Sequence, residues 1–107
     1  MFFNVHGNIW KIQFVNPKSK ELLRSDGSST FGVTDNSVKK VFIADNLSDE
    51  MTERVLCHEL THCICFENDI SIPLETEEWL CNFMAGHGKE IIYLLDDLLR
   101  IILTEVA

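Results

Sequence analysis

An H-E-x-x-H pattern, formed by His58, Glu59 and His62, sets the strongest condition on the fold of this chain. Its two imidazoles can reach one cation only if the segment is helical, because residues four apart in an α-helix are offset by ~40° and lie about one turn apart. Ser48 is a favourable N-cap, and two acidic residues follow it, which suits the positive end of the helix dipole. The pattern therefore predicts a helix from about Asp49 to about Glu67, with both histidines on one face.

A catalytic zinc site usually takes three protein ligands and leaves a fourth position for water, so two histidines are insufficient. The downstream acidic candidates are Glu67, Asp69, Glu75, Glu77 and Glu78. Glu67 is on the same helix but turned away from the histidine face. Glu78 is favoured, because positions 81, 82 and 85 share its helix face and hold cysteine, asparagine and alanine, which are small or polar. Glu77 is the alternative, since spacing alone cannot separate two adjacent residues.

Other polar residues near this pattern have candidate roles in a hydrolytic site. Glu59 is adjacent to His58 and is the candidate general base for the water that a zinc ion activates. Asn82 is a candidate for orienting a zinc ligand, with a surface amide as the alternative. His87 lies between two glycines and is a candidate oxyanion donor, although a surface histidine fits the same position.

The segment 78–85 reads E-W-L-C-N-F-M-A and begins after the fifteen residues that follow His62. Together with H-E-L-T-H, it resembles the ImmA/IrrE-type and related minimal gluzincin metallopeptidases, in which a segment like E-x-x-A-N-x-F-A follows the H-E-x-x-H helix. Cys81 stands where alanine is usual. The resemblance covers about residues 31–90 and implies a zincin-like core, hydrolysis of a peptide or protein substrate, and an origin in a phage or another mobile element. The implied Zn²⁺ ligands are His58, His62 and Glu78.

The first half of the chain carries strand signals. In the segment 8–15, Trp10, Ile12 and Phe14 alternate with the other residues and form an apolar face of period two. The segments Thr30–Thr34 and Val38–Ala44 read as two further strands, and the residues between them, 35–37, favour a turn. These signals predict an antiparallel hairpin within a small antiparallel sheet of about three strands.

The second half of the chain reads as helical. A second helix is predicted to begin near Leu74, and Gly86-His87-Gly88 is predicted to interrupt it before a third helical stretch, Lys89 to about Thr104. The sequence leaves open whether the last two helices form one bent rod. The predicted fold class is therefore α+β, with the small sheet followed by two or three helices in a single zincin-like domain over residues 1–107.

Composition narrows the class of partner. The chain has 107 residues, which suits one domain, and its 46% of hydrophobic residues is enough for a core. Its 9 basic and 17 acidic residues give a net charge of −8, which argues against binding to nucleic acid or to an anionic membrane. The apolar stretch Ile91–Leu103 is cut by Asp96, Asp97 and Arg100, which argues against a membrane span. The breadth of that stretch leaves homodimerisation open.

The cysteines bear on the cellular compartment. Cys63 and Cys65 are too close for an easy mutual disulfide, and the segment Met1–Trp10 lacks the basic and apolar regions of a secretory signal. Buried, reduced thiols in a cytoplasmic protein are therefore predicted for all four cysteines. These residues are Cys57, Cys63, Cys65 and Cys81.

Two further expectations concern the substrate and the rival function. A peptide could add as an extra strand along Val38–Ala44, which directly precedes the metal helix, although Lys39 and Lys40 fit equally well as charges that protect a sheet edge. The alternative to a peptidase is a zinc-containing binding or regulatory module without catalytic activity. Glu59 favours the peptidase, because a purely structural site has no use for it.

Overall fold

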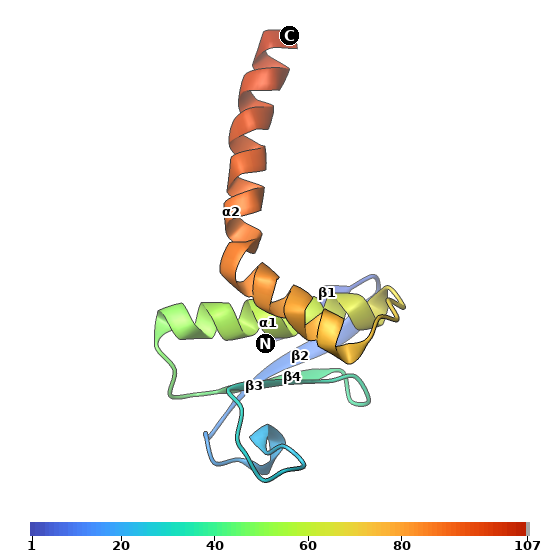
Figure 1. Ribbon diagram of the computed structural model, residues 1–107, viewed down its shortest axis with the longest axis vertical. Coiled ribbons are helices and arrows are strands. Elements are labelled where there is room, and N and C mark those ends of the chain that lie inside the picture. Colours follow the sequence, from blue (N-terminus) through green and yellow to red (C-terminus); the bar gives the residue numbers. More distant parts are fainter. Residues whose placement is uncertain (107) are drawn as a thin grey trace.

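The computed structural model describes residues 1–106, which form an α+β arrangement of a four-stranded mixed sheet and two α-helices (Figure 1). A short 3-10 helix, η1, lies between the second and third strands. The elements in chain order are β1 (Phe2–Val5), β2 (Asn8–Val15), η1 (Lys20–Leu22), β3 (Gly32–Asp35), β4 (Lys40–Ala44), α1 (Asp49–Glu67) and α2 (Leu74–Val106).

The sheet has the order β1-β2-β4-β3, so the prediction of about three antiparallel strands is wrong in strand number and in direction. Strand β2 pairs with β4 in parallel, because the chain passes through η1 and β3 before it returns beside β2. The extra strand β1 forms a hairpin with β2 through a two-residue turn, in which His6 and Gly7 have φ values of 51° and 89°. Such a turn needs positive φ at both positions, and the pair His-Gly signals it less clearly than Asn-Gly.

The predicted hairpin between the third and fourth strands is present as β3 and β4, with shifted ends. Strand β4 lies between β2 and β3, so the prediction that it offers a free edge to a peptide is wrong. The side of β4 that does not pair with β3 is hydrogen-bonded to β2 in parallel, so no free edge is left on β4. The edge strands are β3 and β1.

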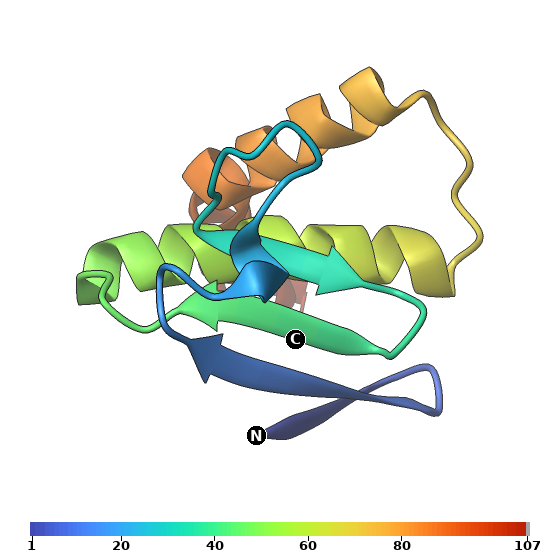
Figure 2. The same cartoon turned by 90° about the horizontal axis from the view of Figure 1, so that it is seen from below.

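Helix α1 covers one face of the sheet, and its predicted bounds are confirmed (Figure 2). The Ser48 side chain accepts a hydrogen bond from the Met51 backbone N at 3.1 Å, which caps the helix as predicted. The core beneath α1 is formed by Val5, Trp10, Ile12, Val41, Ile43 and Cys63. The opposite face of the sheet is covered by η1, whose Leu22 packs against Phe42 and Ala44.

Helix α2 is a single helix over Leu74–Val106, so the last two predicted helical stretches form one rod, the alternative that the sequence left open, and Gly86-His87-Gly88 does not break it. Figure 1 shows that α2 bends in its orange part, and two glycines within three residues are a physical cause of such a bend. The first part of α2 packs against α1, whereas the second part projects from the domain and gives the molecule its length of 56 Å. Within residues 1–106, no helix has both the length and the apolarity needed to cross a membrane.

Candidate metal centre

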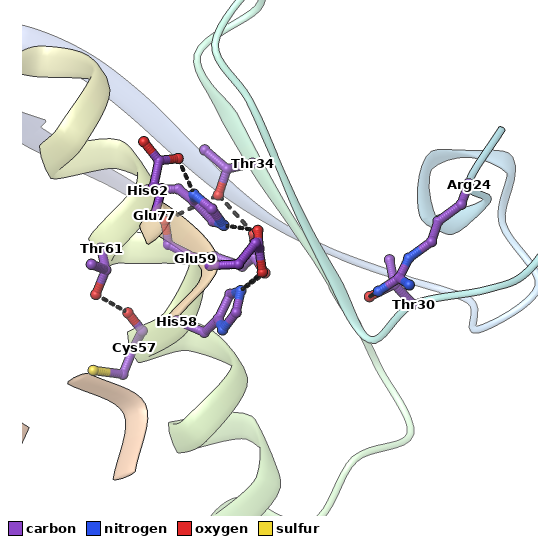
Figure 3. A network of polar contacts seen from close by, with 10 residues as sticks. Arg24, Thr30, Thr34, Cys57, His58, Glu59, Thr61, His62 and Glu77 are labelled. Carbon is purple, nitrogen blue, oxygen red and sulfur yellow. Dashed lines mark hydrogen bonds and ion pairs between the residues drawn. The ribbon is translucent and has the colours of Figure 1, made fainter. Parts of the chain in front are cut away.

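His58, Glu59 and His62 lie in the middle of α1, on the side that faces β3 and the start of α2 (Figure 3). The centroids of the two imidazole rings are 5.1 Å apart, and the rings are inclined at 67°. Both rings are largely buried. The spacing of four residues therefore brings the two nitrogen donors to one place, as the sequence predicted.

Glu78 reaches both histidines from α2. Its Oε2 atom lies 3.2 Å from His58 Nε2, and its Oε1 atom lies 2.8 Å from His62 Nε2. One carboxylate thus contacts the same type of ring nitrogen on both histidines. Its side chain is 46% exposed, so water can reach this carboxylate while the rings stay covered. All three residues predicted as metal ligands come together here.

Glu77, the alternative to Glu78, contacts a different atom. Its Oε2 atom lies 2.6 Å from His62 Nδ1, and its side chain is mostly buried. A carboxylate on Nδ1 fixes the proton on that nitrogen and leaves the Nε2 lone pair free for a metal, and it also holds the ring orientation. The two adjacent glutamates therefore act on opposite sides of the His62 ring.

Glu59 is 6% exposed, and its carboxylate lies between Thr34 of β3 and His58, with Oε2 4.0 Å from His58 Nε2. Thr34 Oγ1 lies 2.9 Å from Glu59 Oε1 and 3.0 Å from the Glu59 carbonyl oxygen, so one hydroxyl serves both acceptors. Burial raises the pKa of the Glu59 carboxyl, and the Thr34 hydrogen bond opposes that change only in part. A Cβ added at Gly32 would lie 2.7 Å from Val55 Cγ1 and 3.0 Å from Glu59 Cγ, so glycine permits this close approach of β3 to α1.

Cys81 joins the cluster, which the sequence reasoning missed. Its side chain is fully buried, and its Sγ atom, with one ring nitrogen from each of His58 and His62, forms a group whose members lie within 4.8 Å of one another. These three residues could hold a metal ion. Burial raises the pKa of the Cys81 thiol to about 12. The signal was present, because Cys81 lies one turn after Glu78 on the same face of α2.

The other cysteines lie outside this group. All four cysteines are free thiols, and three of them are buried as predicted, whereas Cys57 is only half-buried. The Cys57 thiol donates a hydrogen bond to the Met84 carbonyl oxygen at 3.4 Å, and Cys63 packs in the core beneath α1. The contact of Cys57 with Met84 shows that this thiol points toward the first part of α2, away from the imidazoles (Figure 3).

A cleft opens over the metal-binding groups. Two adjoining hollows, of about 520 Å³ and about 390 Å³, share His58, Glu59 and Glu78 in their walls. Both are also lined by Arg24 and Thr30, from the loop between η1 and β3, where Arg24 Nη2 donates to Thr30 Oγ1 at 3.3 Å. No local sequence pattern indicates this wall, because a loop remote from the motif supplies it.

Two of the predicted accessory residues have different surroundings. Asn82 lines the larger hollow. His87 is 57% exposed, its Nδ1 atom lies 3.0 Å from Glu90 Oε2, and its ring is tilted by 37° against the Phe83 ring. His87 is not among the residues that line the two hollows, so its position offers no support for the oxyanion role.

Glu67, a rejected ligand candidate, belongs to a separate cluster at the end of α1. Its Oε1 atom accepts hydrogen bonds from Trp10 Nε1 at 2.9 Å and from Lys39 Nζ at 2.8 Å, and its Oε2 atom accepts from Asn8. Lys39 is therefore engaged in an ion pair rather than placed on a free sheet edge. Its partner Glu67 has a pKa below the ordinary value, chiefly because of the Lys39 hydrogen bond.

No protein-family model matches the chain, and a search of curated proteins finds no match either. The resemblance to ImmA/IrrE-type peptidases therefore rests on the motif residues.

Proposed function

We propose that this chain is a zinc-dependent metallopeptidase with a zincin-like active site. The observation that carries the proposal is the position of Glu78, whose two carboxylate oxygens lie 3.2 Å and 2.8 Å from His58 Nε2 and His62 Nε2. Two imidazoles and one carboxylate are a donor set of catalytic zinc sites. The buried Glu59 next to this set supplies the acid–base group that hydrolysis requires.

The residues fit a zinc ion in their chemistry and in their support. His58, His62 and Glu78 would hold it, while Glu77 on Nδ1 keeps the His62 ring in the tautomer that presents Nε2. When bound, zinc would polarise the scissile carbonyl and lower the pKa of a water molecule toward neutrality.

Glu59 would act as general base and then as general acid. Its carboxylate takes a proton from the attacking water and delivers that proton to the leaving amine. Burial raises the pKa of Glu59, which makes its carboxylate a better proton acceptor than an exposed glutamate. The Thr34 hydroxyl holds Oε1 at 2.9 Å, which leaves Oε2 for the substrate side.

The substrate would be a peptide or an extended protein segment bound in the cleft. Strand β3 is a sheet edge, and its first residue, Gly32, lines both hollows together with His58 and Glu59. A peptide that added to this edge would form backbone hydrogen bonds and would pass the metal-binding groups. Arg24, in the part of the wall formed by the loop between η1 and β3, would attract an acidic side chain or a terminal carboxylate of the substrate.

Zinc analysis and a peptide-library assay test the proposal. The wild-type protein should contain about one zinc ion per chain. Glu59→Gln should keep the zinc and lose roughly 10²- to 10⁴-fold in cleavage rate, the usual contribution of a general base. Glu50→Gln removes an exposed carboxylate from the first turn of the same helix and should cleave like wild type. A Glu59→Gln variant that retained full cleavage would refute this mechanism.

A zinc-containing binding or regulatory module remains the second candidate, and Cys81 is the observation that favours it. Cys81 and Glu78 each lie close to both histidines, and structural zinc sites are closed by four protein ligands. Under this alternative the wild type cleaves no member of the library, and Glu59→Gln binds its partner as tightly as wild type does.

A further inference from the structure

The thiol of Cys81 has no use in the hydrolysis proposed above, yet it lies beside both histidines of the site. Its side chain is fully buried, and its Sγ atom lies within 4.8 Å of a ring nitrogen on each of His58 and His62. Around a tetrahedral ion with bonds of about 2.0 to 2.3 Å, neighbouring ligand atoms are themselves only ~3.5 Å apart. Small side-chain rotations are therefore enough to bring all three atoms onto one ion.

The two helices supply matched pairs of donors. Helix α1 presents His58 and His62, four residues apart, and α2 presents Glu78 and Cys81, three residues apart. Both spacings place the two side chains of a pair on one helix face, about one turn apart. Because α1 and α2 pack against each other at this point, the two faces meet. His58, His62 and Cys81 thus offer donor atoms within 4.8 Å of one another, and Glu78 contacts both histidines from the wall of the cleft.

We propose that Cys81 coordinates the metal through Sγ as the buried ligand, and that Glu78 is the exposed ligand that water or substrate displaces. The inference rests on the metal site proposed above and specifies how that site is completed. On binding, the S–H bond breaks, the Sγ–metal bond forms, and the proton passes to solvent, so one proton is released from Cys81 per ion bound. No oxidant or reductant takes part.

The exposure of the two α2 donors supports this division of roles. Cys81 is fully buried, whereas the Glu78 side chain is 46% exposed and forms part of the cleft wall. A ligand at the cleft surface can leave the ion while the buried ligand stays. The thiolate also makes the site softer than two imidazoles and a carboxylate alone, which favours zinc and cobalt over magnesium, calcium and manganese.

Titration of the metal-free protein with Co²⁺ alone tests the proposal. Thiolate coordination to Co²⁺ gives intense near-ultraviolet charge-transfer absorption, which nitrogen and oxygen ligands do not give. Wild type should develop this band as one Co²⁺ per chain binds, and Cys81→Ala should lack it and bind Co²⁺ more weakly. Cys57→Ser is the matched control, because the Cys57 thiol lies in the same region but contacts Met84 instead of the two histidines. This variant should keep the band.

X-ray absorption of the zinc-loaded wild type gives a second measurement that needs no variant. It should show one sulfur at about 2.3 Å together with nitrogen or oxygen ligands at about 2.0 to 2.2 Å. If Cys81→Ala does not fold, this measurement and Cys81→Ser, which preserves the size of the side chain, decide the question. A wild-type protein that binds Co²⁺ without the band and zinc without sulfur overturns the proposal, as does a band that persists in Cys81→Ala.

The cleavage assay separates failure of this inference from failure of the proposed function. Sulfur coordination without any cleavage would support Cys81 as a ligand and refute the peptidase function. Cleavage without sulfur coordination would support the peptidase function and refute Cys81 as a ligand. A wild-type protein that takes up neither zinc nor Co²⁺ removes both.

Discussion

Two glutamates on α1, eight residues apart, occupy opposite environments. The side chains of Glu59 and Glu67 are 8% and 4% exposed, so both carboxylates are withdrawn from water. Glu67 is surrounded by donors, because an ammonium, an indole and an amide all point at its oxygens. Glu59 has one hydroxyl and no lysine or arginine among its ion-pair partners in the described part of the chain. The pKa of Glu67 is accordingly lowered, and that of Glu59 is raised.

This difference indicates a structural role for the Glu67 carboxylate and a functional role for the Glu59 carboxylate. Glu67 connects the end of α1 to β2 through Trp10 and to the β3–β4 connection through Lys39, so its charge is stabilised by the fold. Burying Glu59 without a cation disfavours its charge, and a sequence selected for stability alone would place an uncharged residue there. Perturbed, poorly paired groups in a cleft are typical of functional sites.

Glu77→Gln should have the largest effect among the variants that sharpen this comparison. Glu77 is a third largely buried carboxylate, and its partner is His62 Nδ1 at 2.6 Å rather than a permanent cation. An amide cannot hold the Nδ1 proton as strongly, so metal affinity should fall by roughly 10- to 100-fold. Competition with a chelator measures this change.

The control for that experiment is Glu75→Gln, two residues earlier on α2, where the side chain is exposed. It changes the net charge equally and should leave metal affinity unaltered. If the two variants bound zinc with the same affinity as wild type, the Glu77 contact would have no role in holding His62.

A pair of isosteric substitutions tests the comparison directly. In the metal-free protein, Glu67→Gln should lower the free energy of unfolding, because Lys39 loses its anion and an amide N–H meets other donors. Glu59→Gln should leave that free energy unchanged or raise it, since an uncharged amide can still accept from Thr34. Urea unfolding of both variants with excess chelator provides the measurement. Shifts of the same sign and size would show that the two environments do not differ in energy.

Local patterns predicted the elements that depend on neighbouring residues. The capping residue Ser48 and the spacing of His58 and His62 gave the bounds and the face of α1. The pairing of β2 with β4 could not be predicted in the same way, because it joins segments separated by η1 and β3. The sequence left open whether the two glycines around His87 separate two helices or lie within one bent helix, and the helix continues through them, since a helix tolerates glycine at a cost of about 1 kcal/mol each.

In the candidate site, too, the features set by local sequence were predicted and those set by the packing of distant segments were not. Helical spacing brought Glu78 to the histidines, but whether Glu77 or Glu78 reached Nε2 depended on the angle at which α2 crosses α1. Cys81 was predicted as an ordinary buried thiol, because a free cysteine is usually a core residue, and it is indeed buried. Arg24 and Thr30 entered the cleft wall through a loop fold that no local pattern specifies. What a single helix determines was predictable, and what the packing of several elements determines was not.

The smallest expected effect is a change in the acid dependence of stability. The folded-state pKa of Glu67 lies below its ordinary value of 4.5, so its contribution to stability is fully present above about pH 4.5 and is lost as the pH falls through the folded-state pKa. The free energy of unfolding of wild type should therefore decline over that range, and Glu67→Gln should decline less steeply. Urea unfolding at a series of pH values measures the difference between the two curves, with Glu50→Gln as the control for loss of one exposed charge on α1. Parallel curves for wild type and Glu67→Gln would mean that Lys39, Trp10 and Asn8 do not stabilise the charged form of Glu67, and the contrast with Glu59 would then have no basis in their partners.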